Sequence, residues 1–74
     1  MGQHLERMKI EFKELKERYD KLVDFLGTPK FNTLHFEQKS LLKQQKEVMK
    51  KYGQILKKRI RLDEQIERET NYIP

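Results

Sequence analysis

The chain contains no cysteine and only two histidines, His4 and His35. Disulfide bonds are therefore excluded, and the residues of an ordinary structural zinc site are missing. The chain has no run of about 18 apolar residues, the length needed to span a bilayer. Its first residues also lack the basic segment and apolar stretch of a secretory signal. With 74 residues, the chain has room for one small domain held together by packing. We expect a cytoplasmic protein with no metal, no cofactor and no membrane partner.

Charged residues make up 39% of the chain and hydrophobic residues 35%, a balance found both in coiled coils and in disordered chains. Periodicity distinguishes the two. In the first third of the chain, apolar residues alternate in spacings of three and four, which is a heptad pattern. They are Leu5, Met8, Phe12, Leu15, Tyr19, Leu22 and Leu26. The pattern predicts a first helix over about residues 4–26.

A connection over residues 27–35 is predicted to follow the first helix. Gly27 stands where a left-handed residue would close that helix. Pro29 cannot continue a helix, and it biases Thr28 away from the helical region. The first helix is therefore expected to end at this point.

A second helix is predicted to begin near His35 and to run over about residues 36–69. Phe31 is expected to pack back on the end of the hairpin, together with Leu34. Thr33 is one candidate for the helix cap, and His35 with Gln38 three residues later is a weak form of a capping box. Residues 70–74 are expected to form a frayed tail.

Three rows of side chains recur at intervals of seven along the second helix. One row is Leu41, Val48, Ile55 and Leu62, another is Leu42, Met49 and Leu56, and between them runs a central row of Gln45, Tyr52, Arg59 and Ile66. Together they form an apolar arc wider than one neighbouring helix can cover. One flank should therefore meet the first helix, and the other a second chain.

The predicted helix lengths support the same conclusion. At about 1.5 Å per residue, the first helix is roughly 33 Å long and the second roughly 50 Å. In an antiparallel pair the second helix would overhang from about residue 57, leaving Ile60, Leu62 and Ile66 without a partner in the same chain. The sequence thus predicts an all-α protein in which residues 1–74 form one antiparallel two-helix hairpin. Its packing should be like that of a coiled coil, and it should assemble into a homo-oligomer.

Charge is unevenly distributed along the chain. Residues 30–61 hold ten lysines and arginines and two glutamates, a net charge of +8, which leaves −3 for the remainder of a chain of net charge +5. Such an excess suggests an anionic partner, although the lysines could also form a solvated face that guides assembly. Because the cations are dispersed around the helix and no DNA-reading motif is present, we do not expect nucleic acid as the partner.

Two groups of residues are candidates for a binding site. Along the central row, Tyr52 offers an aromatic face, Gln45 an amide and Arg59 a guanidinium, which together suit a base and a phosphate. The alternative is that Tyr52 is core and Gln45 sets the register of a coiled coil.

The second group is Lys30, Phe31 and Asn32 in the connection, with a cation, an aromatic ring and an amide close together. Its alternative is an ordinary turn in which Phe31 is a hydrophobic plug. No nucleophile stands beside a base, and no glycine-rich phosphate loop occurs, so we do not expect an enzyme.

The segment LLKQQKEVMKKYGQILKKRI (residues 41–60), preceded by DFLGTPKFNTL and a heptad helix rich in Glu and Lys, resembles short helical-hairpin proteins encoded by tailed phages. It is similar to the hairpin of phage sponges that counter the CBASS and Thoeris defences, over roughly residues 5–62. The resemblance implies an oligomer, often a hexamer, with pockets between subunits. These pockets sequester cyclic oligonucleotide or cyclic ADP-ribose signals in the cytoplasm of the infected bacterium, without cleaving them.

The positions that match this hairpin are Gln45, Met49, Tyr52 and Arg59 on the second helix and Pro29, Phe31 and Asn32 in the connection. The resemblance implies ligand contacts for the polar ones. Two other functions remain open. One is a structural or protein-binding coiled-coil hairpin, and the other is nonspecific binding of nucleic acid.

Overall fold

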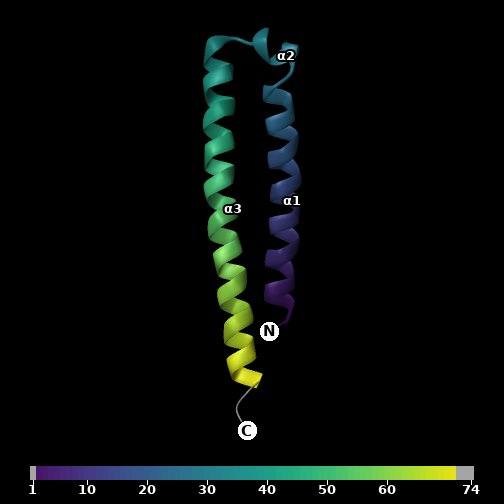
Figure 1. The fold of residues 1–74 in the computed structure, drawn as a ribbon, viewed down its shortest axis with the longest axis vertical. Helices are drawn as coiled ribbons and strands as arrows, with labels where there is room; N and C mark the ends of the chain where they lie inside the picture. Colours follow the sequence, from purple (N-terminus) through teal and green to yellow (C-terminus); the bar gives the residue numbers. More distant parts are fainter. Residues whose placement is uncertain (1, 72–74) are drawn as a thin grey trace.

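The computed structural model describes residues 2–71, and the side chains of residues 4–68. It contains the helices α1 (Gly2–Leu26), α2 (Pro29–Asn32) and α3 (Phe36–Asn71). Residues 2–71 include no β-strand, so the predicted all-α class is confirmed. The two long helices lie side by side and run antiparallel, with α2 across one end (Figure 1). The molecule measures 62 × 15 × 15 Å.

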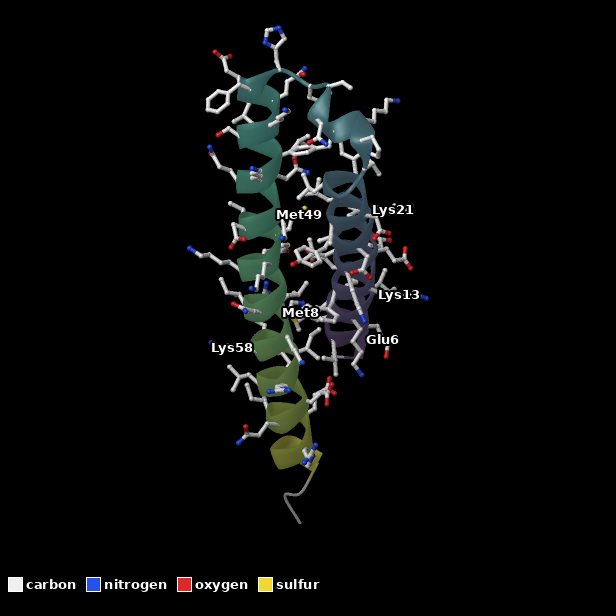
Figure 2. All side chains as sticks on the ribbon, turned by 45° about the horizontal axis from the view of Figure 1, so that its top comes forward. Glu6, Met8, Lys13, Lys21, Met49 and Lys58 are labelled. Atoms are coloured by element: carbon white, nitrogen blue, oxygen red, sulfur yellow. The ribbon has the colours of Figure 1, made fainter. Side chains whose placement is uncertain are left out.

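The heptad row of α1 faces α3. Leu5 and Met8 are buried against Leu56, whose exposed fraction is 0%, and Phe12 and Ile60 pack around this cluster. In Figure 2, Met8 and Met49 lie between the two helices, whereas Lys58 points away from them. Further along the pair the α1 row is only half-buried. Two helices bury one stripe each, so the core is narrow and the rest of each helix stays in solvent.

The end of α1 differs from the sequence prediction. Gly27 does not have a positive φ, so it is not the left-handed residue that we expected. Instead, the Gly27 amide donates to the Asp24 carbonyl at 3.2 Å, and the Thr28 amide donates to the Phe25 carbonyl at 3.0 Å. The Thr28 hydroxyl donates to the same carbonyl at 2.6 Å. These bonds satisfy the Asp24 and Phe25 carbonyls near the end of the helix without a left-handed residue. Thr28 is extended (φ −91°, ψ 154°), as expected before Pro29.

A short helix, α2, lies within the connection that we predicted over residues 27–35. Its Phe31 is buried, and the ring lies edge-on to Phe25 with centroids 6.2 Å apart. The ammonium groups of Lys39 and Lys43 each lie 6.0 Å from the centre of the Phe31 ring. Phe31 therefore links the end of α1 to the first turns of α3 through apolar and cation–π contacts.

Of the two candidate caps for α3, the structure shows the bond of the His35–Gln38 pair. The Thr33 hydroxyl donates to the Lys30 carbonyl at 2.7 Å, which completes α2 and leaves it no role as a cap for α3. The His35 amide donates to Oε1 of Gln38 at 3.3 Å. This bond is the half of a capping box that the third helical residue supplies.

The overhang of α3 is shorter than predicted. Ile60, which we expected to have no partner, packs on the buried cluster, because α1 begins at Gly2 and its first turns reach that level. Beyond it, His4 Nε2 lies 3.4 Å from Asp63 Oδ2, and Lys9 Nζ lies 3.6 Å from Glu64 Oε1. Of the predicted tail, residues 70 and 71 belong to α3, and residues 72–74 lie outside the described residues.

Candidate ligand-binding site

The predicted residues of the central row lie on one edge of the helix pair. Gln45, Tyr52 and Arg59 are all exposed. The Tyr52 hydroxyl donates a hydrogen bond to the Glu11 carboxylate on α1. This bond raises the pKa of Tyr52 above its usual 10.0, because the carboxylate favours the protonated phenol, while the nearby positive charge of Arg59 opposes the shift. The hydrogen bond of Tyr52 thus links this edge of α3 to α1.

The central row extends along the helix instead of converging on one point. The amide of Gln45 lies 3.8 Å from the Met49 sulfur of its own helix. Two heptads separate Gln45 from Arg59, which is about 21 Å along the axis. A single chain therefore does not bring these two groups to one small ligand.

The three predicted site residues of the connection differ in how far they are buried. Lys30 and Asn32 are exposed, whereas only 7% of the Phe31 surface is accessible. Phe25 and two ammonium groups already contact the Phe31 ring. Phe31 packs in the way described by the plug alternative, while its predicted role as a stacking surface for a ligand stays untested.

A groove of about 490 Å³ lies on the opposite edge of the pair, between α1 and α3. Its apolar residues are Phe12, Leu15, Tyr19, Met49 and Gly53, and its polar residues are Lys16, Asp20, Lys50, Gln54 and Lys57. Successive helical residues turn by about 100°, so Lys50 points roughly 160° away from Tyr52. The lysine rim of the groove and the central row consequently face different sides of α3, with Met49 between them.

The groove was missed in the sequence analysis, although Gly53 signalled it. Gly53 follows Met49 by four residues and precedes Leu56 by three, so it stands in the stripe that faces α1. Glycine in a helix interior costs up to about 1 kcal/mol relative to alanine, so its presence needs a reason. An added Cβ at Gly53 would lie 3.7 Å from Leu15 Cδ2. The absence of a side chain leaves space between the helices beside Leu15.

A basic edge borders the groove. It consists of Lys39, Lys43, Lys46, Lys50, Lys57 and Arg61, which are spaced by three, four or seven residues. That spacing places all six on one side of α3. Lys39 and Lys43 share the Phe31 ring, and Lys50 and Lys57 both line the groove. Six of the ten cations of residues 30–61 are thus grouped, a tighter arrangement than the dispersed one that we expected.

The structure distinguishes the two flanking rows of α3. The row of Leu42, Met49 and Leu56, which we call the inner row, faces α1, whereas the row of Leu41, Val48, Ile55 and Leu62, which we call the outer row, is exposed. The accessible fractions are 63% for Leu41, 65% for Val48, 55% for Ile55 and 55% for Leu62. The first three directly precede the three residues of the inner row, and Leu62 follows Ile55 by seven residues. The inner row contacts α1 through Met49 and Leu56, so the outer row points past α1 into solvent. A stripe of regularly spaced aliphatic side chains therefore remains uncovered in one chain.

Among the described residues, no group of three or more His, Cys, Asp or Glu side chains could hold a metal ion. No described helix is long and apolar enough to cross a membrane.

The sequence profile of Sequestin matches residues 2–62. The chain belongs to the Sequestin family. The Sequestin match covers α1, α2 and most of α3, and it therefore includes the groove, the outer row and all six residues of the basic edge. The name Sequestin points to sequestration of a ligand. No curated protein and no solved structure matches the chain.

Proposed function

We propose that this protein is a phage-encoded sponge that binds and withholds a cyclic nucleotide-type immune signal in the cytoplasm of an infected bacterium. It acts by stoichiometric binding, without cleaving the signal. The observation that carries the proposal is the Sequestin match, because it spans nearly the whole helix pair and indicates that a ligand is withheld.

The charge of the described surface supports an anionic ligand. The basic edge presents six cations on one side of α3. Cyclic oligonucleotides and cyclic ADP-ribose combine phosphate charges with flat bases. Ammonium groups bind phosphates, and aromatic or apolar side chains stack on bases, so a surface that combines both suits this class of ligand.

The outer row supports assembly with further copies of the same chain. Its residues recur every seven positions, which is the period of coiled-coil contacts, and all four are aliphatic and exposed. We propose that the outer row of one copy packs against a second copy, and that the finished particle is a closed homo-oligomer, a hexamer in the hairpins that this chain resembles. The exposed central row would then border the interface, where Gln45, Tyr52 and Arg59 can contact either the partner copy or the ligand.

The test is to measure the mass of the purified protein in solution and then its thermal unfolding with a ligand panel. The panel contains cyclic dinucleotides, cyclic trinucleotides and isomers of cyclic ADP-ribose. At 100 times its dissociation constant, a ligand stabilises the folded state by about 2.7 kcal/mol. For a chain of this size, that corresponds to a rise of roughly 10 °C or more. The ligand should be recovered intact after the protein is denatured.

Two rival functions give different results in the same experiment. A structural coiled-coil hairpin would form the oligomer, but no ligand would raise its melting temperature. A nonspecific nucleic-acid-binding protein would ignore the small molecules and bind duplex DNA with an affinity that falls steeply with salt.

A further inference from the structure

We infer that the groove between α1 and α3 is the ligand site, and that it takes a small anion with a planar aromatic group, as in a nucleotide. The inference rests on the proposed function and names the surface that performs it. It assigns the ligand to Lys16, Lys50 and Lys57 and to the apolar residues beneath them, rather than to the central row.

The shape and lining of the groove fit such a ligand. Its volume of about 490 Å³ is within the usual range for small-molecule sites. Phe12 and Tyr19 contribute aromatic rings from α1, and Met49 contributes a polarisable sulfur from α3. Apolar and aromatic surface of this kind favours a flat base, because stacking removes both partners from water. Gly53 keeps the space between them open.

The charges at the rim fit the other half of the ligand. Lys16 approaches from α1, and Lys50 and Lys57 approach from α3, with Asp20 as the one acidic residue of the lining. A phosphate bound at the rim would contact ammonium groups from both helices. The basic edge continues on both sides of the groove, towards Lys46 in one direction and Arg61 in the other. It therefore attracts anions to this face over a longer range.

The central row is less suited to an anion. Its Tyr52 hydroxyl already donates to Glu11, so a carboxylate stands beside the aromatic ring and would repel a phosphate. The row also adjoins the outer row, which the proposed second copy covers. Ile55 of the outer row points roughly 160° away from Lys57, so the groove stays open when copies pair through the outer row.

The experiment compares two double substitutions that remove the same charge. Lys50→Gln with Lys57→Gln removes two cations from the groove. Lys51→Gln with Lys58→Gln is the matched control. These two lysines directly follow Lys50 and Lys57 on the same helix and are exposed like them, but they do not line the groove. Calorimetric titrations use cyclic di-adenylate, cyclic di-guanylate, cyclic ADP-ribose and inorganic phosphate, with duplex DNA as a further arm. Thermal unfolding shows that each variant remains folded.

We expect the groove pair to weaken nucleotide binding by at least about tenfold, because two charge-assisted contacts are lost. The control pair should change the nucleotide affinity by less than about twofold, because salt screens exposed charges that do not contact the ligand. Inorganic phosphate should bind more weakly than any nucleotide that binds, because it has no base to stack.

Other outcomes overturn the inference in distinguishable ways. Equal weakening by both pairs would show that only overall charge matters. No weakening by the groove pair, with a loss in Arg59→Gln, would move the ligand to the central row. In both cases the inference fails and the proposed function stands. If the unchanged protein binds none of the small molecules, or binds only duplex DNA, the proposed function fails together with the inference.

Discussion

Among the side chains of residues 4–68, Leu56 is the one that is fully buried, so Leu56→Ala is the most direct test of how the pair is held together. The substitution removes the equivalent of about three methylene groups, each worth about 0.8 kcal/mol when buried. The resulting cavity adds to this loss, and Leu→Ala in protein cores costs roughly 2–5 kcal/mol. Because Phe12 and Ile60 around the site are only partly buried, they can relax, and we expect about 2–3 kcal/mol.

That loss is most of the stability that a core of this size supplies, which is about 3–5 kcal/mol. At roughly 4–8 °C per kcal/mol, the melting temperature should fall by roughly 10–20 °C. The assay is loss of helical circular dichroism on heating, repeated over a range of protein concentrations. A fall that is the same at every concentration places the effect within one chain.

The matched control is Ile55→Ala, which removes the same number of atoms from the adjacent residue. Ile55 is 55% exposed in the single chain, so its truncation should barely affect the intrachain contacts. If the outer row pairs with a second copy, this variant instead lowers the solution mass and makes melting depend more strongly on concentration. A loss below about 1 kcal/mol for Leu56→Ala, or equal concentration-independent losses for both variants, would refute the proposed division between the inner and outer rows.

Three further predictions concern other parts of the helix pair. Gly53→Ala should raise the unfolding free energy by up to about 1 kcal/mol, because its Cβ would make an ordinary 3.7 Å contact with Leu15; a lower melting temperature would contradict this. The Tyr52 phenol should ionise above pH 10.0, and Glu11→Gln should lower its pKa towards that value, as followed by tyrosinate absorbance with Tyr52→Phe as the blank. Because the folded-state pKa is raised, the stabilisation by this bond is complete below about pH 10 and is lost as the pH rises through the folded value; an unshifted titration would show that the bond does not form. Phe31→Ala should lower the melting temperature by roughly 10 °C or more, since a buried Phe is worth about 3–5 kcal/mol, and Phe36→Ala is the control because Phe36 is 81% exposed; equal effects would contradict the plug.

The ends of the helices show where local sequence signals were sufficient and where they were not. Pro29 correctly predicted an extended Thr28, because the steric clash involves only adjacent residues. Gly27 was misjudged, because its φ depends on which donors satisfy the last carbonyls, and here the Thr28 hydroxyl is one of them. Likewise, Thr33 was a candidate cap for the second helix, and only the folded turn decided that its hydroxyl donates to the Lys30 carbonyl instead.

The candidate site depended even more on tertiary packing. The central row was proposed because its residues share a face of one helix, which sequence spacing alone can tell. The groove depends on both helices, since Phe12 and Tyr19 come from α1 and Met49 and Gly53 from α3. No spacing rule within one segment places these residues opposite one another.

The sequence by itself determined the helical class and the stripe of the first helix that becomes buried, because heptad spacing follows from the geometry of a single helix. It also indicated that the apolar arc of the second helix is wider than one neighbouring helix can cover, although only the structure decided that the outer row is the flank that α1 leaves exposed. Only the tertiary structure decided the register between the helices, which gives Ile60 a partner and places the space at Gly53 beside Leu15. Register is the sum of many weak contacts between segments far apart in the chain. For that reason the groove and its lysines became visible only once both helices were in place.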